Sequence, residues 1–480
     1  MIVLNSVAAA QELLDKRGAN YSDRPRFALF EVMGWSGTLT FLQWGKRFQM
    51  HRKLIQSSFT KPAIVKYREF QVAEAHKLMQ GIMRDSGNWE ESLRRFATAI
   101  VLGIGFGVSI KNESDPYVKM AVDASYALGH GGAPAGTPVD FFPPSKRCCA
   151  PPFLPPFNRR ASLTADPSLF AVRHLPNWLA RSTSLKFARD WRWSIRAIHD
   201  KPYAAISQQF RQGTAQPSFI TSLLEQDAEL KAKGKVNPMT EADIKGAAGA
   251  VYAAGQDTVS QPRQLNATCA CSLWLPLAAN PPPPHDRHPQ TWSTLVVFIL
   301  NMVLHPDIQR LAQQQLDEVV GPDRLPEFAD RDSLPLIDYI VQETLRWGPV
   351  SPIGVPHRSL ADDTYKGFFI PAGSFVYANA QAMCYDDATY ARPAEFDPLR
   401  FAGLPGSERA AREGLEGRAE PFPTGHFGFG RRICPGRHLA EASVWIVVAT
   451  MLHTLDIGKQ VGPDGKEIIP TVTLTPGLTS

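Results

Sequence analysis

The chain has 480 residues, of which 44% are hydrophobic and 20% are charged, so it is long and apolar enough to bury a large core in one or two domains. The formal net charge is only +5 and the basic residues are dispersed, which excludes the concentrated basic stripe of a nucleic-acid-binding protein. The 6 cysteines form neither a disulfide framework nor a C-x-x-C pair, a pattern that fits an intracellular, reducing compartment.

The N-terminal residues are predicted to fold at once. Residues 1–5 favour a strand, and residues 7–16 favour a helix directly after it. The longest apolar run covers residues 295–304, which is shorter than the roughly 20 residues that a membrane helix needs. We therefore expect neither a membrane anchor nor a signal peptide within this sequence.

A basic segment follows at residues 44–53, W-G-K-R-F-Q-M-H-R-K. It predicts a helix with one basic face, and a solvated surface helix is its plainer interpretation. The next unusual stretch, at about residues 144–172, contains K-R-C-C and two proline pairs, and the segments on either side of it rejoin smoothly without it. We interpret this stretch as a suspect insertion, with a disordered surface loop as the alternative.

A helix is predicted over residues 240–258, with Thr240 as its N-terminal cap. Alanine and glycine dominate its later turns, which would let a large planar ligand approach closely. The helix ends in A-G-Q-D-T, so that Asp257 and Thr258 place a carboxylate beside a hydroxyl. Such a pair can relay protons, although an ordinary helix end is the alternative.

Residues 259–290 interrupt what should be one continuous helix. They contain 4 consecutive prolines at 281–284, and each proline inside a helix costs about 3 kcal/mol or more. Joining residue 258 to residue 291 restores a smooth helix, so we hypothesise that residues 259–290 are a translated, unspliced intron. A zinc site built from Cys148, Cys149, Cys269 and Cys271 is the competing interpretation, but adjacent cysteines and C-x-C are poor spacings for tetrahedral zinc.

Two further helices are predicted before the C-terminal region. The first carries an apolar stripe that ends at G-P (321–322): Ile308, Leu311, Ala312, Leu316 and Val319. The second opens near Pro335 and carries E-x-x-R, in which Glu343 and Arg346 share a face. Taken alone, E-x-x-R is usually a surface pair of small value. Arg400 follows in the segment F-D-P-L-R-F.

Residues 427–436, F-G-F-G-R-R-I-C-P-G, describe a glycine-bent loop that presents the thiolate of Cys434 to a metal. Gly430 and Gly436 are expected to adopt backbone angles that a side chain would forbid, which would let the loop lie close to a flat cofactor. Arg432 is expected to bind acidic groups on that cofactor. A buried structural cysteine in a turn is the alternative.

This loop matches F-x-x-G-x-R-x-C-x-G and so resembles the haem-binding signature of the cytochrome P450 family. The matching positions are Phe427, Gly430, Arg432, Cys434 and Gly436. The basic helix, the A-G-x-D-T helix, the E-x-x-R helix, the arginine segment and the cysteine loop also follow the family's order, over roughly residues 1–475. The sequence resembles the eukaryotic, fungal-like microsomal members, which implies a role in secondary metabolism.

The resemblance implies a mainly α fold with a small β-sheet region, in which haem lies between the long central helix and the cysteine-bearing loop and helix. A single domain over residues 1–480 is expected, interrupted at about 144–172 and 259–290. Eukaryotic members usually begin with a membrane helix. We therefore expect that the N-terminal anchor and the last C-terminal strand are missing here, and that the complete gene product is in the endoplasmic reticulum membrane.

The resemblance also assigns roles to polar residues. Asp257 and Thr258 are implied to deliver protons to dioxygen. Glu343, Arg346 and Arg400 are implied to form a buried charge network that holds the cysteine loop in place, and removal of one partner would cost about 3–5 kcal/mol.

Haem b is the implied cofactor, with Cys434 as the axial ligand of its iron. Arg432, His357 and Arg52 are implied to bind the haem propionates. The family has tryptophan where this chain has Phe48, with Trp44 one turn earlier, so one propionate hydrogen bond is expected to be lost or replaced.

The implied activity is a monooxygenase that uses O2 as co-substrate and hydroxylates a lipophilic small molecule. The expected partner is NADPH-cytochrome P450 reductase, with cytochrome b5 as a second electron donor, and basic residues at 46, 47, 52, 53 and 437 would dock it. The pocket is expected to be lined by residues 27–42, 247–254, 350–355 and 475–478. Two alternatives stay open: an isomerase, dehydratase or peroxygenase of the same fold, and a catalytically impaired product of an unspliced transcript.

Overall fold

Helices make up most of the described chain, and the predicted mainly α fold is confirmed. The computed structural model describes residues 1–131, 183–259, 264–265, 294–402, 419–462, 464–470 and 472–473. The suspect stretch at 144–172, most of the one at 259–290, and pocket residues 475–478 therefore lie outside the described residues. So do Cys148, Cys149, Cys269 and Cys271.

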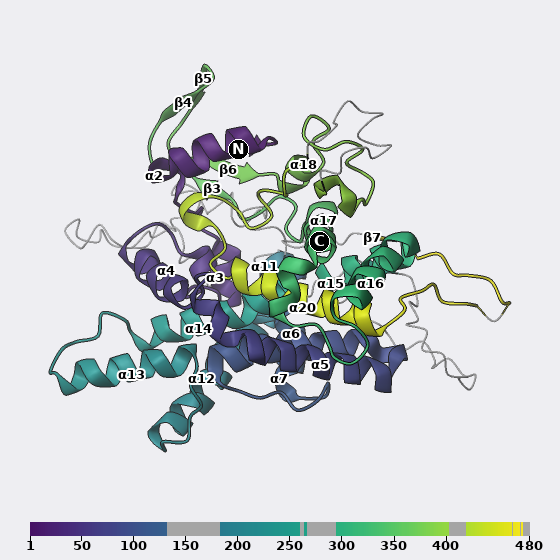
Figure 1. Cartoon of the computed structure of the whole chain (residues 1–480). Coiled ribbons are helices and arrows are strands. Elements are labelled where there is room, and N and C mark those ends of the chain that lie inside the picture. Colours follow the sequence, from purple (N-terminus) through teal and green to yellow (C-terminus); the bar gives the residue numbers. More distant parts are fainter. Residues whose placement is uncertain are drawn as a thin grey trace, which may run out of the picture.

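The helices of the first half of the chain form most of the lower body in Figure 1, while the first of them, drawn in dark purple, lie at the top of that view. They are α1 (Val7–Ala10), the π-helix η1 (Gln11–Lys16), α2 (Gly18–Tyr21), α3 (Ala28–Met33), η2 (Leu39–Phe41), α4 (Lys46–Ser58), η3 (Ala63–Tyr67), α5 (Arg68–Arg84), η4 (Ser86–Asn88), α6 (Trp89–Phe106), α7 (Pro116–His130), α11 (Thr183–Asp190), α12 (Arg192–Arg211), α13 (Phe219–Ala232) and α14 (Glu241–Val259).

The second half adds the helices that carry the charge network and the cysteine loop. They are α15 (Thr294–Leu304), α16 (Pro306–Val319), η5 (Phe328–Ser333), α17 (Pro335–Trp347), α18 (Ala380–Cys384), η6 (Pro398–Phe401), η7 (Gly430–Arg432) and α20 (Arg437–Thr454).

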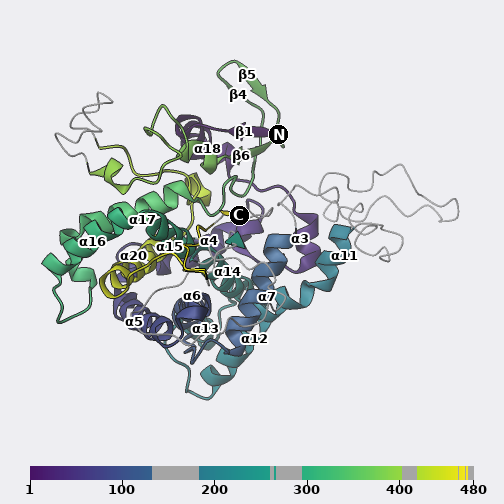
Figure 2. The same cartoon turned by 90° about the vertical axis from the view of Figure 1, so that its right-hand side faces the viewer.

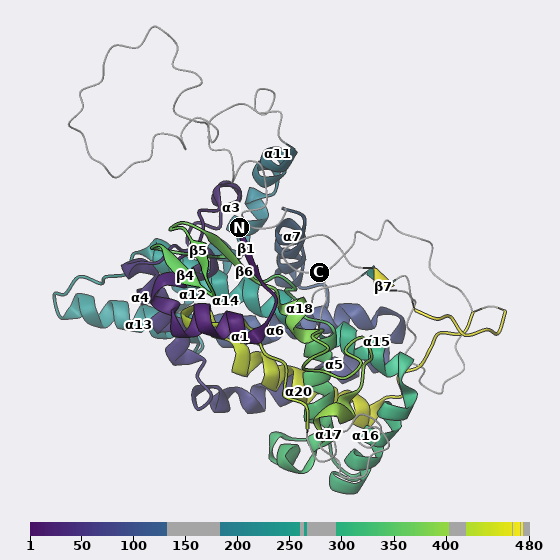
Figure 3. The ribbon, with the colours of Figure 1, turned by 90° about the horizontal axis from the view of Figure 1, so that it is seen from above.

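Within the described residues the strands are short and build three small sheets. They are β1 (Ile2–Leu4), β2 (Gln264–Leu265), β3 (His357–Arg358), β4 (Asp363–Tyr365), β5 (Phe368–Ile370), β6 (Phe375–Ala378) and β7 (Val472–Thr473). In the main sheet, β6 lies between β1, which is parallel to it, and β3, which is antiparallel. Ile2 pairs with Val376, so the N-terminal strand lies beside a strand from late in the chain (Figure 3). β4 and β5 form a hairpin that projects from the body in Figures 1 and 2.

Helix α14 lies in the middle of the helical body, where it contacts α4, α6, α7, α12, α13 and α20 (Figure 2). Its small residues make this possible. A Cβ atom on Gly249 would lie 2.1 Å from the His199 ring of α12, and one on Gly255 would lie 1.9 Å from Val101 of α6. Glycine therefore lets two neighbouring helices approach the axis of α14 more closely than any other residue would.

Helix α20 follows the cysteine loop into the core. Its residues from Val444 to Leu452 are almost fully buried, and it contacts α5, α14, α16 and α17. Because α20 is apolar on nearly every side, it is packed on all of them. The loop that precedes it is thus attached at one end to a helix that is packed in the core.

Most of the local predictions are confirmed. Thr240 caps α14, since its hydroxyl accepts from the Asp243 backbone N–H at 3.2 Å, and α17 begins at Pro335. The apolar stripe of α16 is confirmed except at Leu311, where the prediction is wrong: this side chain is 45% exposed because it points away from the stripe that Ala312 and Leu316 bury.

No single helix in the described part of the chain is long and apolar enough to cross a membrane. The pair α15 and α16 meets the length and composition test only when taken together, and it is bent by 104°.

Candidate functional site

The cysteine loop is held by a backbone hydrogen bond within it and by a contact to the Asp15 side chain. The Cys434 N–H donates to the Phe427 carbonyl at 2.8 Å, and the Gly430 N–H donates to the Asp15 carboxylate. Gly430 has φ +56°, and a Cβ atom there would lie 2.1 Å from the Leu14 carbonyl oxygen. Both observations require glycine, so the loop can rest directly on the π-helix η1 only with this residue.

The predicted special backbone angle at Gly436 is wrong. Its φ is −88°, which any residue adopts, and it precedes the first residue of α20. A Cβ atom at this position would meet only the Cys434 Sγ, at 4.0 Å. The glycine therefore leaves open space around the sulfur. The left-handed glycine next to Gly430 is Gly428, with φ +75°.

The environment of the Cys434 thiol contains opposing effects. Burial raises its pKa, while the backbone N–H groups of Gly436 and Arg437 and the charges of Arg52 and Arg437 lower it. Donors at the start of a helix and nearby guanidinium groups favour the thiolate form. These N–H groups and guanidinium charges therefore stabilise negative charge on the Cys434 sulfur, and a bound metal ion would offset the remaining cost of burying it.

Arg432 is buried without enough partners. Its side chain leaves the residue only 8% exposed, and its Nε donates to the Ser22 carbonyl at 2.7 Å. Its Nη1 and Nη2 are buried and have no hydrogen-bond partner. Burial, followed by repulsion from Arg24, lowers the Arg432 pKa to about 8. At neutral pH the group is still cationic, and its Nη1 and Nη2 lack acceptors.

Arg24 and His357 lie next to this guanidinium. Arg24 donates to the Val355 and Pro356 carbonyls, its Nε is buried without a partner, and burial lowers its pKa to about 9. His357 is 5% exposed, and its Nδ1 lies 2.7 Å from the Tyr21 carbonyl. Burial, followed by the charges of Arg24 and Arg432, lowers the His357 pKa well below its ordinary value.

Phe48 occupies the position where the family has tryptophan. The Arg432 guanidinium carbon lies 3.5 Å from the centroid of its ring. The ring thus supports the guanidinium through a cation–π contact but offers no hydrogen bond. Trp44 does not replace the missing indole donor at this spot, because its ring lies 5.2 Å from the guanidinium of Arg431 instead.

Arg52 lies on the other side of the loop. Its Nη1 donates to the Ile433 carbonyl, next to Cys434, and its Nε donates to Gln56 at 3.1 Å. Burial lowers its pKa, and the Cys434 charge raises it. Arg52 therefore connects α4 to the cysteine loop, in addition to the propionate contact that the sequence predicts for it.

The structure brings Glu343, Arg346 and Arg400 together in the core. The side chains of all three have no exposed surface. Glu343 accepts from Arg346 at 2.7 Å and 2.8 Å and from Arg400 at 3.0 Å. Arg346 also donates to the Pro393 carbonyl at 2.7 Å. The network therefore ties α17 to the segment that leads from α18 to η6.

Glu420 is a fourth member that sequence analysis missed. Its Oε2 accepts from Arg400 at 2.7 Å, and its Oε1 accepts from the Ala391 N–H at 3.2 Å. With Glu420, two carboxylates balance the two arginines. Glu420 stands shortly before the cysteine loop, so the network extends to that loop through the chain itself. No spacing rule in the sequence distinguishes this glutamate from those around it.

Asp257 and Thr258 lie in the last turn of α14, and their side chains are outside the described part of the structure. Helix α14 contacts α15, which begins at Thr294. Their role in proton delivery therefore stays a prediction.

The residues around the cysteine loop fit haem. Two buried arginines share this region with the acidic side chain of Asp23, whose Oδ1 already accepts from the Trp44 N–H at 2.6 Å. Buried unpaired cations are costly, and carboxylates are the acceptors that guanidinium groups bind best. The two propionates of haem would supply them, with Arg432 and Arg24 as donors and Cys434 as the sulfur ligand.

Arg24 is thus a second residue that sequence analysis missed. It stands before a proline, with Asp23 on its other side, and this short pattern has no particular chemical meaning. Its position becomes clear only because it packs against carbonyls some 330 residues away in the chain. Within the described ranges there is no group of three or more His, Cys, Asp or Glu residues arranged to hold a metal ion.

Comparison with known proteins gives full-length matches. The family described as Cytochrome P450 matches residues 1–264 and 289–478. A cytochrome P450 monooxygenase of Armillaria gallica is 32% identical over 483 residues, which cover 100% of this chain and 80% of the relative. Cytochrome P450 monooxygenase 136 of Postia placenta is 32% identical over 482 residues, covering 100% and 78%. Tryptamine 4-monooxygenase of Psilocybe cyanescens is 29% identical over 489 residues, covering 100% and 81%.

Proposed function

Because the chain belongs to the cytochrome P450 family and is therefore a monooxygenase, we propose that it inserts one oxygen atom of O2 into a C–H bond of a lipophilic small molecule. The observation that carries this proposal is the pair of buried arginines beside the Cys434 loop, which leave three nitrogen atoms without an acceptor. A buried structural cysteine in a turn would explain Cys434 but not the unpaired nitrogen atoms of the two arginines.

Haem, when bound, would supply the oxygen-activating chemistry, with the Cys434 thiolate donating electron density to its iron. Arg432 and Arg24 would hold the propionates, and the other ring nitrogen of His357, Nε2, is a third contact. The charge network of Glu343 would hold the loop at a fixed position. Asp257 and Thr258 are proposed to relay protons to dioxygen, because a carboxylate and a hydroxyl that are adjacent in the sequence can pass protons on.

The proposed substrate is lipophilic because aromatic side chains gather in the predicted pocket segment 27–42. The Phe41 ring lies 5.5 Å from Phe27, 4.8 Å from Phe30 and 5.8 Å from Trp35, measured between ring centroids. Large apolar surfaces of this kind favour apolar ligands. The name of the Psilocybe relative shows that tryptamine is a substrate within this group of proteins.

Electrons are proposed to come from NADPH through a flavoprotein reductase, because the sequence has no flavin or nicotinamide fingerprint. Of the predicted docking residues, Arg47 pairs with Asp243 of α14, and Arg52 donates to the Ile433 carbonyl. Lys46 and Lys53 are exposed, whereas Arg437 donates to the Cys434 carbonyl at 3.2 Å. We therefore assign the attraction of an acidic partner mainly to the two lysines.

We propose a single domain interrupted by insertions at about residues 144–172 and 259–290. The second insertion is supported by the family match, which leaves residues 265–288 out. Sequencing of spliced transcripts tests this proposal. A mature transcript that keeps the codons for residues 259–290 would exclude the intron hypothesis, whereas one that lacks them supports it.

The function is tested with the haem-loaded protein, the reductase and NADPH, using isotopically labelled dioxygen and a panel of lipophilic compounds. Incorporation of one labelled oxygen atom into a product supports the proposal. Thr258→Ala is expected to divert reducing equivalents to peroxide, so that NADPH consumption continues while product falls. Turnover that depends on neither NADPH nor O2 would instead support a same-fold isomerase or dehydratase.

A further inference from the structure

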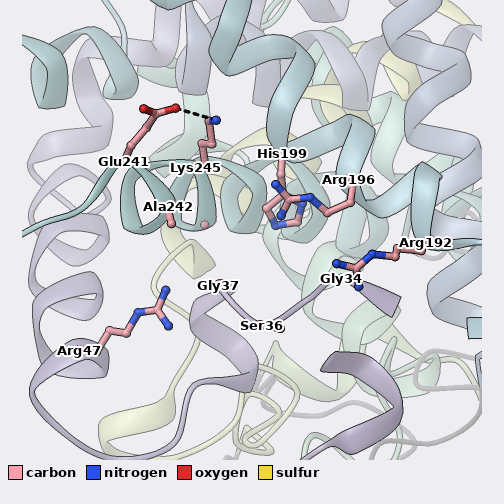
Figure 4. Close-up of a pocket in the computed structure, with 11 residues that line it drawn as sticks. Gly34, Ser36, Gly37, Arg47, Arg192, Arg196, His199, Glu241, Ala242 and Lys245 are labelled. Carbon is pink, nitrogen blue, oxygen red and sulfur yellow. Dashed lines mark ion pairs between the residues drawn. The ribbon is translucent and has the colours of Figure 1, made fainter. Parts of the chain in front are cut away.

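A cavity lies where the loop after α3 meets the first turns of α4, α12 and α14 (Figure 4). It has a volume of about 400 Å³, within the range of small-molecule sites, and we call it the α12–α14 cleft. None of its lining residues surrounds Cys434. Gly34, Gly37 and Gly246 form part of its wall, and a Cβ atom on Gly246 would lie 2.2 Å from the Gly37 carbonyl oxygen. The loop therefore rests directly on α14.

Four basic side chains line this cleft, and three of them are matched to a carboxylate. The matched pairs are Lys245 with Glu241 at 2.7 Å, Arg196 with Asp200 at 2.6 Å, and Arg47 with Asp243 at 2.5 Å. These pairs leave the fourth cation to be accounted for.

Arg192 is that cation. Its Nη1 donates to the Val32 carbonyl at 2.6 Å and to the Glu31 carbonyl at 3.5 Å, and it forms no ion pair within the described part of the chain. The Glu31 carboxylate is already bound by Arg26, at 2.8 Å and 3.1 Å. The cleft thus contains one positive charge more than its carboxylates balance.

His199 adds no charge at neutral pH. Its Nδ1 lies 2.7 Å from the Ile195 carbonyl and must therefore carry the proton, so Nε2 accepts from the Thr38 hydroxyl at 3.1 Å. Burial, together with the charge of Arg196, lowers its pKa to about 4. The unbalanced positive charge of the cleft is therefore that of Arg192, and His199 does not add to it.

Two of the guanidinium groups have N–H donors to spare. Arg47 uses only its Nε, and Arg192 uses only its Nη1, in the hydrogen bonds of the described residues. Figure 4 shows these two groups approaching the space beneath α14 from opposite sides, with Ser36 and Gly37 between them. Planar guanidinium forks match the two oxygens of a carboxylate better than they match a spherical ion.

We propose that the α12–α14 cleft binds a small organic monocarboxylate, separately from the oxidation site. Its single negative charge balances Arg192, and its oxygens accept from the unused donors of Arg192 and Arg47. The Ala242 methyl group and the glycine backbone offer an apolar surface for the rest of the molecule. A neutral molecule of the same shape would contact the apolar surface but would not balance the charge of Arg192.

Benzoate is the probe, and benzamide is its neutral counterpart. Their dissociation constants are measured by isothermal titration calorimetry on the haem-loaded full chain at low ionic strength. Benzoate is expected to bind about tenfold more tightly than benzamide, as charge-assisted hydrogen bonds predict. Salt should weaken the binding of benzoate only.

Arg192→Gln is expected to weaken benzoate binding about tenfold, and Arg47→Gln provides a second test from the opposite side of the cleft. Arg211→Gln is the matched control, because Arg211 is exposed on the same helix and also donates to a backbone carbonyl, that of Ser207. It should change the affinity less than twofold. Equal binding of benzoate and benzamide would overturn the proposal. So would equal benzoate affinities of Arg192→Gln and Arg211→Gln, which is the result expected if benzoate binds in the haem pocket instead.

Discussion

Arg432 and Arg24 are two buried cations whose arrangement makes sense only with an anionic cofactor. Three of their nitrogen atoms are buried without a partner. In a haem-free protein these groups lower the free energy of unfolding, because a buried donor without an acceptor costs about 1–3 kcal/mol. The residues that are proposed to bind the propionates therefore destabilise the haem-free protein.

Arg432→Met should therefore have opposite effects on the two forms of the protein. The haem-free form is expected to become more stable by about 1–2 kcal/mol, because the unpaired guanidinium is removed. The haem-loaded form is expected to lose haem more quickly, because a propionate loses its donor. Urea unfolding and haem transfer to an acceptor protein measure the two effects. Arg431→Met, at an exposed neighbour, is the control, and destabilisation of both forms by Arg432→Met would contradict this account.

His199 makes stability depend on pH. Burial lowers its pKa from 6.5 to about 4, so between these values the unfolded chain binds a proton that the folded chain does not. The free energy of unfolding should then fall as the pH falls from about 6.5 to about 4, by at most about 1.4 kcal/mol per pH unit for one group. His426, whose pKa burial also lowers to about 4, adds to the effect.

The His199→Gln variant should be less stable at neutral pH but should lose less stability on acidification. Urea unfolding at several pH values between about 4 and 7 measures both quantities. Parallel pH profiles for the variant and the original chain would show that His199 does not remain neutral in the fold.

At the scale of residues, the sequence predicts site residues correctly where their function depends on local spacing. Cys434 and Gly430 stand in one short loop, and the structure gives Gly430 a left-handed backbone and a contact that excludes a side chain. Arg24 was missed because its partners are carbonyl groups contributed by a distant segment. The prediction for Gly436 was wrong because glycine can be required either for a left-handed backbone or for the space that a missing side chain leaves, and the sequence does not distinguish these two roles.

At the scale of elements, the charge network couples α17 to the cysteine loop. Its three predicted members stand in segments that carry recognisable motifs, so they could be identified from the sequence. Glu420 could not, because it contributes through packing against Arg400 rather than through a pattern. With it, the network contains no net charge, which is the condition under which buried ionic groups are tolerated.

Glu420→Gln tests this coupling. It leaves Arg400 with one carboxylate partner in place of two, and it is expected to lower the free energy of unfolding by about 2–4 kcal/mol. Haem retention should fall with it if the network holds the loop. Glu395→Gln is the control, because the Glu395 side chain is 54% exposed and pairs with Arg392, while its carbonyl serves the network. Equal effects of the two substitutions would argue against a role for Glu420.

At the scale of the whole molecule, the fold brings together residues from both ends of the chain. Ser22 and Arg24 meet Arg432 and His357, and β1 pairs with β6. The mainly helical class and the order of elements could be predicted, since hydrophobic periodicity determines them locally. The pairing of distant segments could not be predicted from periodicity and rested on resemblance to the family.

The central claim is that the Cys434 sulfur binds haem iron, and a carbon monoxide spectrum of the reduced protein tests it most directly. The haem-loaded chain is predicted to show the red-shifted Soret band of a thiolate-ligated complex. Cys434→Ala should abolish this band, while Cys384→Ala, at a buried free cysteine elsewhere, should keep it. A Cys434→Ala variant that retains the red-shifted band, or an original chain whose spectrum shows only imidazole or water as ligand, would contradict the account.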